Sequence, residues 1–214
     1  MMLTRAGVVA ILITGLLTAG QADESSRDGK GTQMSVKTID AREQLARFDS
    51  TKDPLYLENA IRDLEQVDLI EEQGQDRQAA RREVMILWLA SLAALQKAKD
   101  PTFDPNDRPK ANMVPAPGSS GRRYPSGIDP KAIPEPDVRA QYEAALAKNR
   151  QKAETYRIQY RLRFLEERVQ PGVDGFIGRY YSKSSIDRGE LRELVERTPI
   201  PQEQKQRLLA VQLR

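Results

Sequence analysis

Residues 84–95 form an apolar run that most constrains how the chain can fold. The run contains eleven apolar residues and one serine, so a helix formed from it is apolar on every side. It is shorter than the ~20 residues that a membrane-spanning helix needs. A helix that is apolar all round belongs in a protein interior. We therefore expect the remaining chain to cover it.

Three helices are predicted before residue 100 from apolar residues at helical spacing. The first covers residues 38–48, and the third covers residues 77–99 and contains the apolar run. The second begins at Asp53, whose side chain can cap a helix that opens with proline, and it ends near residue 70. The residues of the first two helices expected to pack inward are Ile39, Leu45, Phe48, Leu57, Ala60, Ile61, Leu64 and Val67.

Residues 101–136 contain nine of the thirteen prolines and lack apolar periodicity. This composition is typical of an extended connector. The segment is long for a passive loop, so it is either anchored along the helices or used as a docking segment. The residues that could anchor it are Phe103, Met113, Tyr124, Ile128 and Ile133.

A long helix is predicted over residues 137–170, where Pro171 should end it, and a short helix follows over residues 173–181. Asp187 and Glu190 match a capping box that begins the next helix, with Ile186 and Leu191 as its hydrophobic staple. The last helix should cover residues 202–213. The predicted fold class is all-α: a helical hairpin or bundle around a buried central helix, a proline-rich connector, and a long helix with short C-terminal helices.

The first residues resemble an export signal. Arg5 precedes an apolar segment, and Gly20 and Ala22 place small residues where a signal peptidase cleaves, so the mature chain should begin at Asp23. The next residues have the polar composition of a disordered lead. An uncleaved N-terminal anchor helix is the alternative to export into the periplasm or out of the cell. The predicted division is a signal peptide (1–22), a lead (23–36), a helical layer (37–100), the connector (101–136) and the long helix with its cap (137–214).

The chain has no cysteine and no histidine. Disulfides, thiolate or imidazole metal sites and the commonest general base are therefore excluded. Carboxylate chemistry remains open through pairs such as Glu71–Glu72 or Glu166–Glu167, although an ion pair with Arg163 is the expected role of the second pair. An oxygen-rich segment lacks the glycine and the closing glutamate of a calcium loop, so no metal or cofactor is predicted. Its members are Asp100, Asp104, Asn106 and Asp107.

The candidate site is a basic and aromatic part of the long helix. Residues 148–163 hold six basic residues and one acid, Glu154. Arginine beside tyrosine is enriched at protein interfaces and suits anionic ligands. The alternative is that the arginines pair with the first half of the chain, because residues 37–100 carry ten basic and thirteen acidic residues. The candidate binding residues are Lys148, Arg150, Lys152, Tyr156, Arg157, Tyr160, Arg161, Arg163 and Phe164, with Arg122, Arg123 and Tyr124 in the connector.

These features predict an exported, non-catalytic helical protein that binds or scaffolds another protein in the periplasm or cell envelope. A homodimer through the long helix is one form of this hypothesis. The first alternative is a protein that binds an anionic glycan or lipid through the Arg/Tyr face. The second is a carboxylate-dependent hydrolase. Nucleic acid is the least favoured partner, because export removes the chain from most of it.

Overall fold

The computed structural model describes residues 36–67, 69, 74–109, 113–115, 123–125, 129–181 and 184–211. The chain divides into two units, Met1–Gln33 and Met34–Arg214. The first unit, with the predicted export signal and nearly all of the predicted lead, lies outside the described residues. The second unit contains all of the helices and strands that the structure describes.

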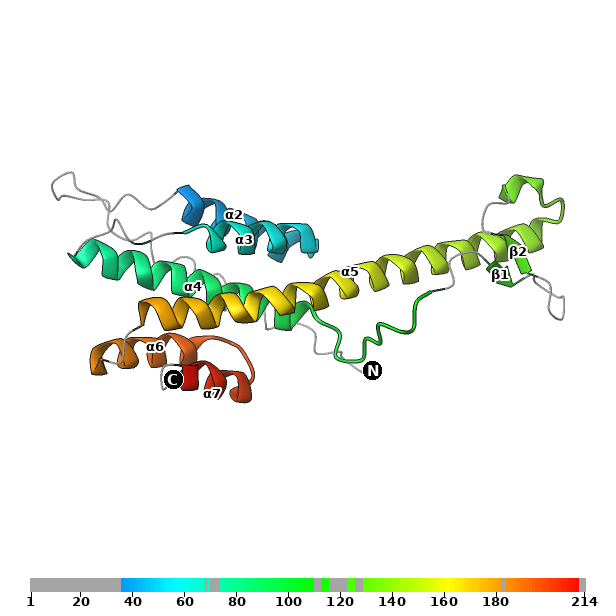
Figure 1. The fold of residues 1–214 in the computed structure, drawn as a ribbon. Helices are drawn as coiled ribbons and strands as arrows, with labels where there is room; N and C mark the ends of the chain where they lie inside the picture. The colour runs from blue at the N-terminus through cyan, green and yellow to red at the C-terminus, as the bar shows by residue number, and fades with distance from the viewer. Residues whose placement is uncertain are drawn as a thin grey trace, which may run out of the picture. The chain divides into compact units, whose positions relative to one another are not determined.

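The fold is all-α, as predicted (Figure 1). The C-terminal half of α5 lies between α4 on one side and α6 and α7 on the other. One cluster of buried apolar residues extends from Ala41 to Leu208 and joins these helices. The helices are α2 (Val36–Thr51), α3 (Pro54–Glu65), α4 (Gly74–Ala98), α5 (Pro136–Tyr180), α6 (Ser185–Arg197) and α7 (Gln202–Val211), with short elements β1 (Met113–Pro115), β2 (Arg123–Pro125) and η1 (Pro130–Ala132).

The apolar run lies in α4, and the chain itself covers it. Trp88 is 2% exposed, and Met85, Leu92 and Leu95 are fully buried. Ser91, the polar residue of the run, is buried too, and its hydroxyl donates to the carbonyl of Leu87 at 2.9 Å, so its hydrogen bond is satisfied within the helix. Among the described residues, no helix combines the length and apolar character needed to cross a bilayer.

The two helices before α4 follow the predicted pattern with two exceptions. The second helix was predicted to end near residue 70, but α3 ends at Glu65 and Val67 lies beyond it, still buried. Asp53 caps α3 by accepting a hydrogen bond from the backbone N–H of Leu55 at 2.9 Å. Leu45, Phe48 and all the predicted inward residues of α3 are buried. The prediction for Ile39 was wrong: its side chain is 45% exposed, and Thr38 and Ala41 are the buried residues at that end of α2.

The connector contains short ordered elements. β1 and β2 form an antiparallel pair in which Val114 is opposite Tyr124, a ladder that the proline-rich composition did not predict. After η1, Ile133 is buried against Tyr142 and Leu146 near the start of α5. Ile133 therefore anchors the connector on a helix, which was one of the two predicted roles of this segment.

Pro171 does not end the long helix, so that prediction was wrong. An interior proline removes one helical hydrogen bond and costs ~3 kcal/mol or more; here the lost bond is the one to the carbonyl of Glu167, a residue on the exposed side of α5. On both sides of the proline the helix is fixed in the core by Val169 and Val173, which are fully buried. The predicted short helix over residues 173–181 is thus the last part of α5.

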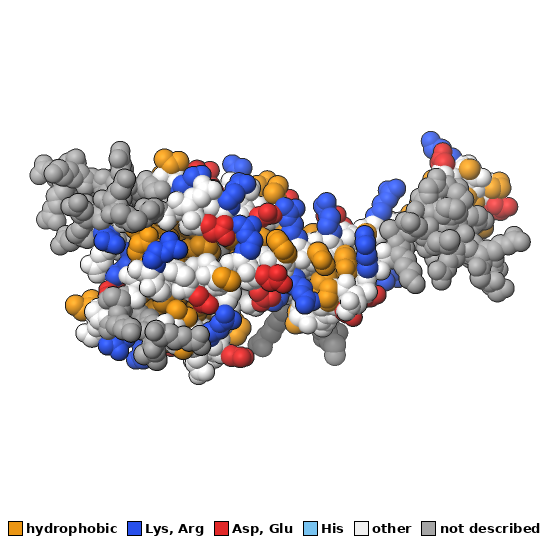
Figure 2. All heavy atoms as spheres, viewed as in Figure 1, with side chains coloured by type: hydrophobic (Ala, Val, Ile, Leu, Met, Phe, Trp, Pro, Cys, Tyr) orange, Lys and Arg blue, Asp and Glu red, His pale blue; other side chains and the backbone are white. Residues whose placement is uncertain are grey.

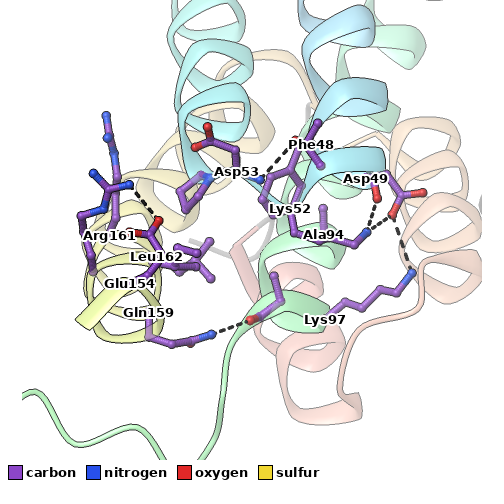
Figure 3. Close-up of a pocket in the computed structure, with 15 residues that line it drawn as sticks. Phe48, Asp49, Lys52, Asp53, Ala94, Lys97, Glu154, Gln159, Arg161 and Leu162 are labelled. Atoms are coloured by element: carbon purple, nitrogen blue, oxygen red, sulfur yellow. Dashed lines mark hydrogen bonds and ion pairs between the residues drawn. The ribbon is translucent and has the colours of Figure 1, made fainter. Parts of the chain in front are cut away.

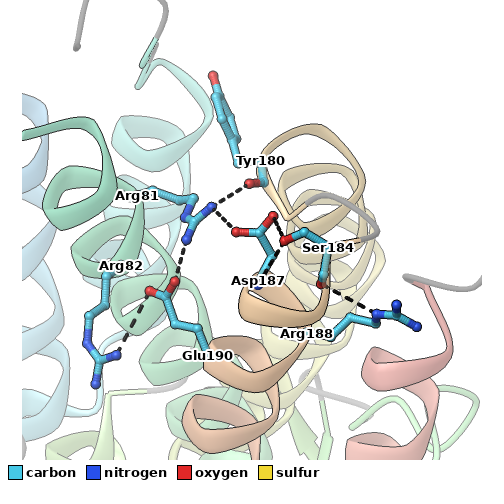
Figure 4. A network of polar contacts seen from close by, with 7 residues as sticks. All are labelled: Arg81, Arg82, Tyr180, Ser184, Asp187, Arg188 and Glu190. Atoms are coloured by element: carbon cyan, nitrogen blue, oxygen red, sulfur yellow. Dashed lines mark hydrogen bonds and ion pairs between the residues drawn. The ribbon is translucent and has the colours of Figure 1, made fainter. Parts of the chain in front are cut away.

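The start of α6 also differs from the prediction. The capping residue is Ser184, whose hydroxyl accepts from the N–H of Asp187 at 3.1 Å and donates to its carboxylate at 2.6 Å. Asp187 therefore lies inside the first turn, and Ile186 is 74% exposed and staples nothing. The carboxylates of Asp187 and Glu190 instead bind Arg81 of α4 (Figure 4).

Candidate partner-binding face of the long helix

The middle of α5 has a core side and an opposite side. Leu162, Leu165 and Val169 are fully buried against the other helices. Tyr156, Tyr160 and Phe164 recur every four residues on the other side, so they are neighbours along one stripe. We call these three residues the aromatic stripe. Phe164 follows Leu162 by two residues, which places it about 200° further round the helix.

The chain covers the first residue of the stripe. The ring of Phe103 lies 5.4 Å from the ring of Tyr156, and the Tyr156 hydroxyl donates to the carbonyl of Pro105 at 2.6 Å. Two further hydrogen bonds hold the chain on α5 just before the connector, because Gln159 accepts from the N–H of Asp100 and donates to the carbonyl of Ala98. Phe103 is thus a connector anchor, as predicted.

The rest of the stripe is open. The ring of Tyr160 stacks on that of Tyr156 with centroids 5.9 Å apart, yet Tyr160 is 54% exposed and Phe164 is 57% exposed. Figure 2 shows hydrophobic side chains in the open over the middle of α5, with lysine and arginine side chains next to them. Large apolar side chains that continue a packed row into solvent are typical of a surface that another molecule covers.

The basic candidates divide into engaged and free groups. Arg161 donates to Glu58 of α3 at 3.0 Å, so this residue pairs with the acidic first half of the chain. Arg157 pairs with Glu154 one turn away. The remaining candidates on α5 are exposed and form no ion pair with any residue that the structure describes. They are Lys148, Arg150, Lys152 and Arg163.

A cleft of about 490 Å³ lies where the loop between α2 and α3 meets the end of α4 and the middle of α5 (Figure 3). Its wall includes apolar side chains such as Phe48 and Leu162, and Arg157 and Arg161 line its edge. Asp49 lies between Lys52 and Lys97 and pairs with both. The cleft therefore has an apolar wall and a rim that carries both signs of charge.

The carboxylates of the cleft are occupied in structural roles. A hydrogen bond from Lys52 holds the pKa of Asp49 below its usual value, whereas a general acid needs a raised pKa. Asp53 caps α3, and Glu154 pairs with Arg157. Each of these three carboxylates therefore has a partner within the fold.

The other acidic candidates are engaged or lie outside the described residues. Glu166 pairs with Lys99 at 2.6 Å, so the expected pairing of Glu166 with Arg163 was wrong, and the exposed Glu167 does not pair with it either. Asp100 and Asp104 close turns by accepting from backbone N–H groups two residues further on. Among the residues described, no cluster of three or more acidic side chains could hold a metal ion. Glu71 and Glu72 lie outside the described residues.

The structure describes only the backbone of two of the three connector candidates. Arg122 lies outside the described residues, and the backbone of Arg123 and Tyr124 belongs to β2. Sequence reasoning missed that Tyr156 is covered while Tyr160 is open. The signal was present in Phe103, the aromatic residue at the start of the connector.

No protein-family model matches the chain, and neither a curated protein nor a solved structure is similar to it.

Proposed function

We propose that the protein is a non-catalytic, helical binding or scaffold protein that holds another polypeptide against the open part of the aromatic stripe. The observation that carries this proposal is the exposure of Tyr160 and Phe164 on the side of α5 that faces away from the core. Aromatic and arginine side chains are the residues that contribute most to protein interfaces. Arg157 and Arg163 flank Tyr160 at a spacing of three residues on either side, which makes them its neighbours on the helix surface.

The setting we propose is the periplasm or cell envelope. The support is the export-signal pattern of residues 1–22 and the absence of cysteine, which leaves the fold independent of redox conditions. A mature chain that begins at Asp23 is the expected result of N-terminal sequencing. Full-length protein in the membrane fraction would instead favour an uncleaved anchor.

Site-specific photocrosslinking tests the binding role. A photoreactive residue at Phe164 should give one adduct of defined mass with a polypeptide in cells that produce the chain. The matched control is Ile186, which is 74% exposed on a different helix and should give none. The same adducts from both positions, or none from Phe164, would contradict the proposal.

The charge on this face supports one competing function, the binding of an anionic glycan or lipid. That function predicts an affinity that falls steeply with salt, because exposed charges are screened within ~10 Å at 0.1 M ionic strength. Binding through Tyr160 and Phe164 predicts instead a large loss in Tyr160→Ser/Phe164→Ser and a weak dependence on salt.

A further inference from the structure

The open part of the aromatic stripe continues a row of side chains that the chain itself already covers. Phe103 packs on Tyr156, Tyr156 stacks on Tyr160, and the row then enters solvent. The segment on Tyr156 forms two consecutive turns, in which the N–H of Phe103 donates to the carbonyl of Asp100 and the N–H of Asp107 donates to the carbonyl of Asp104. It carries an aromatic ring, a proline and two acids, in the sequence Thr-Phe-Asp-Pro-Asn-Asp of residues 102–107. The molecule thus contains one example of what this surface binds.

Two features of that example depend on chemistry that Tyr160 can repeat. The Tyr156 ring packs on an aromatic ring tilted by 58° to it, and its hydroxyl donates to the carbonyl of Pro105. In the turn from Asp104 to Asp107 the carbonyl of Asp104 accepts the turn's own hydrogen bond, so the carbonyl of Pro105 is left to accept from the tyrosine. Tyr160 has the same ring and hydroxyl, one turn further along the helix.

The charges next to the open stripe fit an acidic ligand. Arg163 lies three residues after Tyr160 and is a surface neighbour of the open part of the stripe, whereas Lys152 lies four residues before Tyr156, beside the covered part. Neither forms an ion pair within the described part of the chain, and both are exposed. Glu167 lies three residues after Phe164 and four residues after Arg163, so it is an acidic neighbour of the open part of the stripe.

The geometry points to a partner segment of defined chemistry. The open stripe takes an acidic, turn-forming segment that carries an aromatic residue and a proline, as residues 102–107 do at Tyr156. Its ring packs against Tyr160 and Phe164, a backbone carbonyl accepts from the Tyr160 hydroxyl, and a carboxylate faces Arg163. This inference rests on the proposed function and names the chemical class of its partner.

The test uses a synthetic acetylated peptide with the sequence of residues 100–108, titrated into the isotopically labelled chain and followed by NMR. Chemical shifts should change around Tyr160 and Phe164. In Tyr160→Ser/Phe164→Ser the affinity should fall about fivefold or more, as expected for an interface residue of this kind. In Ile186→Ser it should stay unchanged. Peptides with Phe103→Ala, or with Asp104→Asn and Asp107→Asn together, should bind more weakly.

Several results would overturn the inference. One is the absence of shift changes in the millimolar range, and another is equal binding by Tyr160→Ser/Phe164→Ser. Displacement of residues 102–105 from Tyr156 by the peptide would show that only the covered site has this specificity. Concentration-dependent dimerisation that Tyr160→Ser abolishes would identify a second copy as the occupant. Binding to phosphatidylglycerol vesicles but not to the peptide would identify a membrane surface.

The two proposals fail separately. A polypeptide adduct from Phe164 together with no peptide binding would leave the binding function in place and reject this partner chemistry. Peptide binding without any adduct in cells would reject the function while the surface chemistry stands.

Discussion

The contact between Trp88 of α4 and Gly172 of α5 gives the sharpest structural prediction. A Cβ atom at residue 172 would lie 2.4 Å from Cη2 and 2.7 Å from Cζ3 of the Trp88 ring. Carbon atoms prefer separations of ~3.5–4.0 Å, so the ring would have to move by about 1 Å. Trp88 is 2% exposed, and the surrounding core resists that movement.

Gly172→Ala therefore has two opposing effects. Alanine favours the helix over glycine by ~1 kcal/mol, and the forced contact costs ~1–3 kcal/mol as overpacking. Gly175 and Gly178 of the same helix have open space around an added Cβ, so Gly175→Ala and Gly178→Ala gain the first effect without the second. The free energy of unfolding of Gly172→Ala should therefore lie ~1–3 kcal/mol below that of Gly175→Ala.

Urea denaturation of the three variants measures this difference, and a second background isolates its cause. Trp88→Ala alone should lower the free energy of unfolding by ~3–5 kcal/mol. In that background the ring is gone, so Gly172→Ala should stabilise the protein as Gly175→Ala does. An equal effect of Gly172→Ala in both backgrounds would refute the packing of Trp88 on Gly172.

Three further predictions concern other parts of the fold. Burial raises the pKa of the Tyr181 hydroxyl above its usual ~10. The contribution of the neutral hydroxyl to the free energy of unfolding is therefore complete below pH ~10. Above that pH it falls by up to ~1.4 kcal/mol per pH unit, because the unfolded chain ionises first. Tyr181→Phe should remove this dependence and cost little at pH 7, because the buried hydroxyl has no hydrogen-bond partner within the described residues, and urea titrations at pH 7 to 11 check both points. Arg81→Met leaves the largely buried carboxylates of Asp187 and Glu190 without their main cation, so the free energy of unfolding should fall by ~3–5 kcal/mol. The loss caused by Arg81→Met should be smaller when Glu190→Gln is already present. Additive losses in a double-mutant cycle would contradict this prediction. Lys52 has a φ of 59°. Lys52→Gly and Lys52→Val both lose the ion pair with Asp49, but the glycine variant should have the higher free energy of unfolding by ~1 kcal/mol or more, and the reverse order in thermal melts would contradict a left-handed backbone there.

The helices could be predicted because their signals are local. Apolar spacing identified α2, α3 and α4, and the Asp53–Pro54 start of α3 needs no information from elsewhere in the chain. The apolar run could be predicted to lie in the interior because a helix formed from it has no polar side that could face water.

The errors arose where a distant contact outweighs a local rule. Pro171 is a helix breaker by local rules, but the buried residues around it hold α5 together. Ser184 and Asp187 fit the same capping pattern as Asp187 and Glu190, and the interaction of Asp187 with Arg81 is absent from any local window. Both errors concern interactions between residues far apart in the sequence.

The candidate face was predicted in composition but not in orientation. The spacing of Tyr156, Tyr160 and Phe164 places them together, yet the sequence does not say which of them the connector covers. That outcome depends on where the connector crosses α5, which is fixed by Phe103 and by the hydrogen bonds of Gln159.

The fluorescence of Trp88 in the processed monomer tests the enclosure of the apolar helix most directly. Trp88 is the single tryptophan of the chain, so the emission reports this side chain alone. It is buried, and its ring N–H has no hydrogen-bond partner among the described residues. We predict a strongly blue-shifted emission that acrylamide does not quench. Red-shifted, readily quenched emission would show that the chain does not enclose its apolar helix. The core side of α5 would then be wrong, and so would the inference that Tyr160 and Phe164 face away from it.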